Sequence, residues 1–467
     1  MNISQTKGEF TEQVCHQNFK PFFSIMPQKI RIASDFRLLL SAVVIAVSML
    51  FAQAASGRIF LVSNTADGTG VNTLRGAILA ANANGGSNFI LLMSGTYHLT
   101  LGGPRENAGY TGDLDVTRGD LTIIGSSASR VTISAVGLGD RVLQVLPNAR
   151  LKLENIIVTG GTAPPARSLW LSGENGGGIL NAGTLILKGC LITRNQSGQG
   201  VQGTGGYGGS SGGDGGGIYN SGTLVMDNSE ISDNSCGIGT SGSLGASGGG
   251  IANSGSMMLS SCTINHNVAG KGGQANGQFI FGAKGGDGGG VYNLGTSRLT
   301  LCEIDGNMTG SGTDGAQWGV GNVYPGFPGG GGGPGGNGAG LYNSGNLMLV
   351  GCSIRGNACQ NGGTGGPGFG FTGAGGYGGS GGSGGGVFNS STLIVNNCNI
   401  TDNTCGSGGA GGSGAYGGQG GAGGRGGAIF TSSGSTIIQP KNQFPLNSDG
   451  VAGPDGSGFN SAVQRNR

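Results

Sequence analysis

The clearest pattern in the chain is a short module in which apolar and polar residues alternate. It reads G-[IVL]-x-N-x-G-x-L-x-L-x-x-C-x-I-x-x-N, as in Gly178 to Asn195. Alternation with a period of two is typical of β-strands, and the Gly and Asn residues between the apolar runs favour tight turns. We therefore expect three short strands in each module.

The module recurs along residues 173–440. It opens with a Gly-rich triplet at Gly176, Gly215, Gly248, Gly288, Gly338 and Gly384, and a degenerate copy begins at Gly426. An Asn closes each complete opening, and a second Asn follows 14 residues later: Asn181 and Asn195, Asn220 and Asn234, Asn253 and Asn267, Asn293 and Asn307, Asn343 and Asn357, Asn389 and Asn403. The module is therefore constant in length, and the variation lies in Gly-rich inserts between modules.

Three short strands cannot bury an apolar face alone, so each module must stack on the next. Stacking places like residues above like, with Ile, Leu and Val in internal columns. The pattern predicts an all-β fold, a parallel β-helix of about ten turns, with Asn side chains forming hydrogen-bonded ladders. We expect such a structural ladder at Asn181, Asn220, Asn253, Asn293, Asn343 and Asn389.

Eight of the nine cysteines follow the same register. Five lie nine residues after the first Asn of a module and three lie sixteen after it: Cys190, Cys262, Cys302, Cys352 and Cys398, then Cys236, Cys359 and Cys405. Disulfides are the usual state in exported chains, and a bond between column neighbours is one interpretation. Buried free thiols packed as small apolar groups are the other, and the column arrangement favours them. No CxxC or Cys/His pairing indicates a metal site.

The N-terminal segment predicts export. Lys29, Arg31 and Arg37 precede the apolar run 38–52, and small residues follow in an A-x-A spacing. This arrangement is typical of a secretory signal peptide, and the run is shorter than a membrane-spanning helix requires. We expect a signal peptide over residues 1–54, with Met26 as a possible true start, no membrane span in the mature chain, and a secreted or cell-surface location.

Residues 55–172 are expected to form the first turns and a cap. Residues 145–158 align with the first module at an offset of 34, which predicts another turn without the Gly signature. Before it, Leu74, Ala77, Ile78 and Ala81 share one helical face. A helix here would cover the open end of the solenoid, which is otherwise an aggregation edge. The repeats then span 173–440, and 441–467 is expected to be a C-terminal tail.

Composition supports this division. The chain has 110 Gly in 467 residues and only 10% charged residues, but the Gly residues lack the strict three-residue period that collagen needs. Low charge with a net value of +2 excludes the basic field of a nucleic-acid-binding protein. Two interpretations of the inserts remain open: flexible loops, or extended polyglycine strands packed side by side.

The segment VSNTADGTGVNTLRGAILAANAN, residues 62–84, resembles the SLRQAI-type opening of bacterial exported β-helix repeat proteins, which are related to domains named for a C-S-L-R-E-A motif. The GGGIYNSGTL modules are similar to their repeats and, more loosely, to those of chlamydial polymorphic outer-membrane proteins. The resemblance covers residues 58–440 and implies a right-handed parallel β-helix. Leu74-Arg75 lacks the Cys and the acidic residue of the named motif.

Candidate chemistry is sparse. Glycoside hydrolysis needs two carboxylates facing across a groove, and lyase chemistry needs an acidic cation site with a basic residue. The best candidates are Glu230, Asp233 and Lys271, and their alternative role is as solvated surface residues. Asp214 and Asp287, each in a GGDGGG segment, are weak candidates for calcium. No cofactor motif is found.

The sequence thus favours an exported, non-catalytic β-helix protein with a structural or adhesive role at the cell surface. Its partners would be polysaccharide or other surface components. The alternative is a polysaccharide-acting lyase or glycosidase, since such enzymes occur on this fold. The position of the few charged residues distinguishes the two: gathered in one groove they favour an enzyme, and scattered they do not.

Overall fold

The computed structural model describes residues 57–126, 131–203, 208–275, 280–317 and 326–458. The chain separates into two units, Met1–Ala55 and Ser56–Arg467. The predicted signal peptide lies outside the described residues, and all that follows concerns the second unit.

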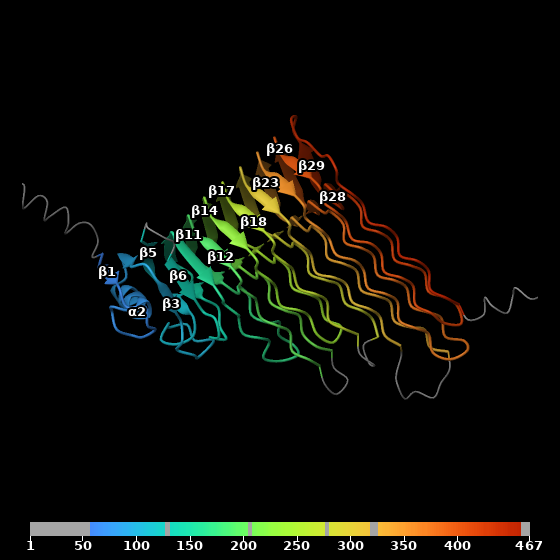
Figure 1. Ribbon diagram of the computed structural model, residues 1–467, viewed down its shortest axis with the longest axis horizontal. Coiled ribbons are helices and arrows are strands. Elements are labelled where there is room, and N and C mark those ends of the chain that lie inside the picture. The colour runs from blue at the N-terminus through green and yellow to red at the C-terminus, as the bar shows by residue number, and fades with distance from the viewer. Residues whose placement is uncertain (1–56, 127–130, 204–207, 276–279, 318–325, 459–467) are drawn as a thin grey trace, which may run out of the picture. The chain divides into compact units, whose positions relative to one another are not determined.

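Three parallel sheets run through this unit (Figure 1). Sheet 1 has eleven strands in the order β1 (Ile59–Val62), β2 (Ser87–Leu92), β5 (Gly119–Gly125), β8 (Ala149–Glu154), β11 (Thr184–Lys188), β14 (Thr223–Asp227), β17 (Ser256–Ser260), β20 (Thr296–Thr300), β23 (Asn346–Val350), β26 (Thr392–Asn396) and β29 (Ser435–Ile438).

The other two sheets have nine strands each. Sheet 2 contains β4 (Leu114–Val116), β7 (Leu143–Val145), β10 (Ile179–Asn181), β13 (Ile218–Asn220), β16 (Ile251–Asn253), β19 (Val291–Asn293), β22 (Leu341–Asn343), β25 (Val387–Asn389) and β28 (Ile429–Thr431). Sheet 3 contains β3 (Thr96–His98), β6 (Val131–Ser134), β9 (Ile156–Thr159), β12 (Leu191–Thr193), β15 (Glu230–Ser232), β18 (Thr263–Asn265), β21 (Glu303–Asp305), β24 (Ser353–Arg355) and β27 (Asn399–Thr401).

Each module supplies one strand to each sheet, and equivalent strands pair in register. Ile179 pairs with Ile218, and Leu185 with Leu224, although 39 residues separate the members of each pair. Successive turns of chain therefore stack as rungs of a right-handed parallel β-helix, as the alternating module predicts. Inward side chains form continuous columns. In the column that contains Ile179, every side chain is fully buried as far as Val387.

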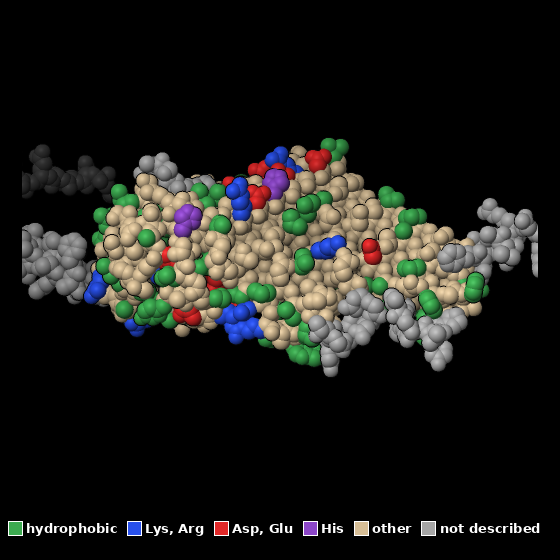
Figure 2. All heavy atoms as spheres, turned by 60° about the horizontal axis from the view of Figure 1, so that its bottom comes forward, with side chains coloured by type: hydrophobic (Ala, Val, Ile, Leu, Met, Phe, Trp, Pro, Cys, Tyr) green, Lys and Arg blue, Asp and Glu red, His purple; other side chains and the backbone are tan. Residues whose placement is uncertain are grey.

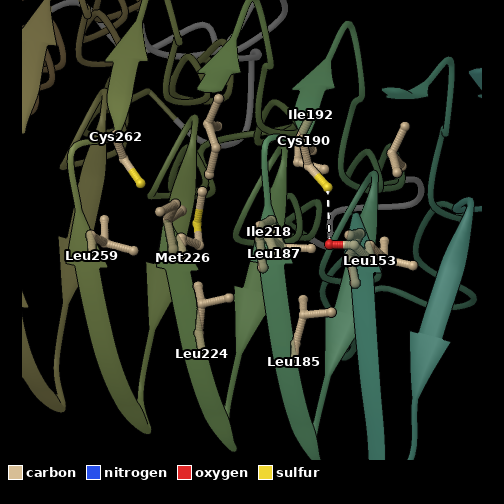
Figure 3. Packing of buried hydrophobic residues seen from close by; sticks show 14 of the residues in the cluster. Leu153, Leu185, Leu187, Cys190, Ile192, Ile218, Leu224, Met226, Leu259 and Cys262 are labelled. Atoms are coloured by element: carbon tan, nitrogen blue, oxygen red, sulfur yellow. Dashed lines mark hydrogen bonds between the residues drawn. The ribbon is translucent and has the colours of Figure 1, made fainter. Parts of the chain in front are cut away.

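The cysteines lie inside this core. All eight cysteines of the described chain are free and buried, and Figure 3 shows Cys190 and Cys262 pointing inward among Leu and Ile side chains. The Cys190 thiol donates to the Leu153 carbonyl at 3.4 Å. Burial raises the pKa of Cys236 to about 12, so this thiol stays protonated. The column residues thus pack as small apolar groups.

Two ladders of asparagine side chains run beside the core. In the first, each Nδ2 donates to the Oδ1 of the next rung at 2.6–2.8 Å, from Asn181 to Asn389. The second runs from Asn195 through Asn403 to Asn447 at 2.8–3.0 Å. Because every member is buried or half-buried, these amides satisfy one another where water cannot.

The N-terminal end carries the expected helix, α2 (Leu74–Asn84), which packs against β1, β2, β4 and β5. The Thr73 hydroxyl accepts from the Gly76 N–H and caps it. Arg75 is buried and pairs with Asp67 at 2.7 Å. The helix therefore covers the first rung, as its apolar face predicts.

One expected register is wrong in part. The offset of 34 holds where Arg150 pairs with Thr184, but Val145 pairs with Asn181 at an offset of 36. The reason is the turn 146–149, which is two residues longer than its counterpart in the first module. Residues 441–458 also pair with the last module, through bridges from Gln443 to Asn399 and from Ser448 to Thr404.

Within the described residues, no helix combines the length and apolarity needed to cross a membrane.

The cysteine columns give a first testable prediction. A thiol reagent added to the folded protein at pH 8 should label none of the eight buried cysteines, because burial keeps their sulfur atoms out of reach of the reagent. The same reagent in denaturant without reductant should label all eight. Mass spectrometry counts the labels, and a count of six or fewer in denaturant would show that a disulfide had formed.

Candidate functional site

The Gly-rich inserts leave the β-helix as ordered pairs of extended arms. The insert 359–384 shows the arrangement along its whole length: an outgoing arm, 359–369, and a return arm, 373–383, are joined by a turn. Figure 1 shows the inserts of successive rungs running side by side away from the sheets. We call these arms together the glycine slab, which comprises the described parts of 162–176, 196–215, 235–248, 268–288, 308–338, 359–384, 405–427 and 448–458.

Hydrogen bonds join the arms in two layers with a three-residue period. Within the outgoing layer, Gly362 and Gly365 donate to the next rung, at Ser407 and Ala410. Between layers, Gly363 donates to the Gly333 carbonyl at 2.8 Å. In a GGx triplet one Gly N–H thus bonds within its layer and the other bonds across layers. The inserts are therefore packed polyglycine-type strands, one of the two arrangements that their composition allowed.

Glycine is required in the middle of this slab. A Cβ atom at Gly363 would lie 2.0 Å from the Thr313 carbonyl oxygen, and one at Gly379 would lie 2.1 Å from that of Gly333. These neighbours are backbone atoms, which cannot move aside without breaking the hydrogen bonds that hold the layers. The excess of glycine in the composition follows from this close approach.

Every third residue of an arm points outward and carries the side chain. In the return layer, several of these side chains form a third ladder, in which each accepts from the backbone N–H of the next rung. The accepting side chains are those of Asn175, Asp214, Ser247, Asp287, Asn337 and Ser383, at 2.7–3.1 Å, and the last of them accepts from the Arg425 N–H. Asp214 and Asp287, the weak calcium candidates, are members of this ladder with one rung between them. Burial raises the pKa of Asp214.

Charged side chains mark both ends of the slab. At its start, Glu174 accepts from Arg105 and Arg141 at 2.6 Å each and so joins the first return arm to the early rungs. At its end, an Asp455 oxygen accepts from the Gly420 N–H at 2.8 Å. In the preceding rung the equivalent donor, Gly378, bonds to another arm.

The structure does not join the catalytic candidates. Glu230 is half-buried on β15, Asp233 is exposed at the following turn with a positive φ of 56°, and Lys271 is exposed on an outgoing arm. No hydrogen bond or ion pair links these three side chains in the described part of the chain. On the face that Figure 2 shows, charged side chains lie in small separate groups.

A buried charged cluster that the sequence reasoning missed lies in the early rungs. Asp113 and Asp115 flank Leu114 of β4, and Asp140 and Arg141 precede β7. Arg141 lies 3.5 Å from Asp113 and 3.9 Å from Asp140. Four carboxylate oxygens of these three aspartates have no hydrogen-bond partner. Burial raises the pKa of Asp113 to about 7 and, with the charge of Asp113, that of Asp115 to about 8.

Beside this cluster, Arg141 and Glu174 line a pocket of about 390 Å³ with Leu180 and Asp214. Among the residues described, no group of three His, Cys, Asp or Glu side chains is arranged to hold a metal ion. A usable signal was present in the segment Gly-Asp-Leu-Asp-Val, residues 112–116, where acidic residues flank an apolar strand residue.

Comparison with known proteins yields similar folds only. No protein-family model and no curated protein sequence matches the chain. Among solved structures, pectate lyase Pel9A aligns with 82% of this chain and 79% of its own, at 14% identity and a TM-score of 0.34. Tailspike protein 3 of bacteriophage CBA120 aligns with 81% and 59%, at 13% identity and a TM-score of 0.28. The fold assignment itself rests on the strand pairing.

The packing of the slab predicts that Gly363→Ala destabilises the protein by about 2 kcal/mol or more, because the new methyl group meets backbone on a fully packed side. The adjacent Thr364→Ala changes an exposed outward residue and should alter stability by less than about 0.5 kcal/mol. Denaturant unfolding measures both. Equal effects at the two positions would contradict the packing described here.

Because of the buried aspartates, we expect the free energy of unfolding to fall as pH rises. Their folded-state pKa values lie above the ordinary value of 3.8, so the folded chain binds more protons than the unfolded chain between about pH 4 and 8. The melting temperature should therefore be higher at pH 5 than at pH 8.5. The pKa of Asp67 is lowered, so ionised Asp67 stabilises the folded chain. That stabilisation is lost only when the pH falls below the ordinary range of carboxyl pKa values.

Asp115→Asn tests the source of this effect. The amide resembles the neutral carboxyl and does not titrate. Between pH 5 and 8.5 the free energy of unfolding of the variant should therefore fall by at least about 1 kcal/mol less than that of the unmodified protein. Asp233→Asn, at an exposed turn, is the matched control and should keep the full decline. An unchanged decline in Asp115→Asn would rule the cluster out as its cause.

Proposed function

We propose that this protein is exported through its N-terminal signal peptide and acts, without catalysis, as a structural or adhesive protein at the cell surface. Polysaccharides or other surface components would be its partners. The observation that carries the proposal is the glycine slab, a large hydrogen-bonded surface whose buried side is backbone and whose outward side chains recur at every third residue.

The slab supports a role in presentation because, away from the third ladder, backbone atoms rather than outward side chains hold its layers together. Gly363 and Gly379 donate their N–H groups across the layers, whereas the neighbouring Thr364 and Ser380 are exposed. Outward residues of this kind can therefore change without loss of packing, as is expected of a surface that binds other molecules. Few of these residues are charged.

The arrangement of charged groups gives less support to a polysaccharide-cleaving enzyme. Glu230, Asp233 and Lys271 are not joined by any described hydrogen bond or ion pair. The Asp214 carboxylate is engaged by a backbone N–H in the return-layer ladder, and Glu174 is paired with two arginines. Hydrogen bonds and ion pairs of this kind are typical of carboxylates with a structural role. Catalytic carboxylates of a glycosidase would instead face the substrate from the two sides of a groove.

A binding and degradation screen tests the proposal. The exported protein should begin after residue 54 by mass spectrometry, should be retained on at least one polysaccharide or surface fraction, and should release neither reducing sugars nor unsaturated ends. Heat-unfolded protein is the control for retention. Release of sugar products by the folded protein would overturn the non-catalytic role in favour of a lyase or glycosidase.

A further inference from the structure

Three exposed aromatic side chains lie on the outer face of the return layer, where most outward residues are small. Phe281 is 65% exposed, Tyr377 is 67% exposed and Tyr416 is 67% exposed. Each occupies an outward position in the three-residue period of its arm. Large apolar rings at such exposure mark interaction surfaces more often than single small apolar residues do.

Backbone hydrogen bonds fix the positions of these residues relative to one another. Gly282 donates to the Gly331 carbonyl and Gly332 donates to that of Tyr377, so Phe281, Gly331 and Tyr377 lie in one column on three successive arms. Gly375 donates to the Tyr416 carbonyl. Tyr416 is therefore one arm beyond Tyr377 and one triplet nearer the turn.

These steps give nearly equal spacing along a path that bends at Tyr377. Two arms separate Phe281 from Tyr377, so this step runs straight across the arms, whereas one arm plus three residues separates Tyr377 from Tyr416, so the second step runs mainly along them. With about 4.8 Å between neighbouring chains and about 3.1 Å per residue along an extended arm, both intervals are about 10 Å. An interval of this size suits a repeating polymer that curves at Tyr377 and whose units contact successive rings.

The surface between the rings is open and almost uncharged. Gly331 has no side chain, and its ideal Cβ position lies 3.8 Å from the Phe281 ring, so nothing rises between Phe281 and Tyr377. Gln419 is the neighbour of Tyr377 on the next arm. Among the described residues of the return arms, the charged side chains nearest to Phe281 are Lys284 and Asp287, and these pair with each other at 2.5 Å.

We propose that this face binds an uncharged polysaccharide whose chain curves at Tyr377 and whose sugar rings stack on Phe281, Tyr377 and Tyr416. The apolar C–H faces of pyranose rings pack on aromatic rings, and their hydroxyls find amide and hydroxyl partners in Gln419 and Ser380. The lack of free charge argues against an anionic polymer, which would need unpaired Lys or Arg side chains. This inference rests on the proposed adhesive function and names its ligand.

Affinity electrophoresis and calorimetry with soluble polysaccharides test the site. The panel contains a neutral β-glucan, a neutral xylan and the anionic polygalacturonate. The full chain should bind a neutral polymer more tightly than polygalacturonate. Tyr377→Ala should weaken that binding at least 10-fold, and Phe281→Ala and Tyr416→Ala several-fold. Phe371→Ala is the control, because this ring is 95% exposed but lies at the turn beyond the return-arm columns.

The outcomes separate the two proposals. If the polymer binds equally well to the protein lacking all three rings, with melting temperatures unchanged, the aromatic site is wrong and the adhesive function still stands. If no neutral polymer binds, or polygalacturonate binds best, the inference is overturned. If the polymer is cleaved, the non-catalytic function itself fails.

Discussion

The structure depends on how closely two extended backbones can approach one another. In the glycine slab, carbonyl oxygens occupy the space that a Cβ atom would fill, as at Gly363 and Gly379. Both oxygens belong to a neighbouring arm of the same layer, so the arms can pack at this spacing only because the Cβ atoms are missing. The β-helix core obeys a milder form of the same condition, since its rungs stack at a strand spacing that places Ile, Leu and Val side chains in contact with one another. Close stacking thus requires glycine in the slab and columns of similar apolar side chains in the core.

Much of the fold could be predicted because the module repeats at constant internal length. The spacing from Asn181 to Asn195 fixes three strands and two ladders, and any other register would place polar residues in the core. Turn lengths were harder to predict. The turn at 146–149 holds two more residues than its counterpart and yet leaves the pairing of the next strand unchanged. The second ladder continues to Asn447, which lies outside the repeating module.

The slab and the buried charges show where sequence reasoning reaches its limit. GGx triplets fit flexible loops as well as packed arms, and the choice depends on hydrogen bonds between residues more than 40 positions apart, such as Gly362 and Ser407. The cluster of Asp113, Asp115 and Asp140 was missed because its rungs lack the Gly signature that directed attention to later acidic residues. Burial of these aspartates becomes visible only when β4 and β7 are paired.

The last described outgoing arm, 448–458, differs in two columns from the arms before it. Gly362 and Gly408 have their Cβ positions directed at their own return arms, and the next residue in that column is Ala452. Asp455 likewise follows Gly365 and Gly411, and its carboxylate accepts from the Gly420 N–H, whose counterpart Gly378 donates to a neighbouring arm. A single carboxylate side chain can therefore satisfy a backbone donor that elsewhere in the slab is satisfied by a whole further arm.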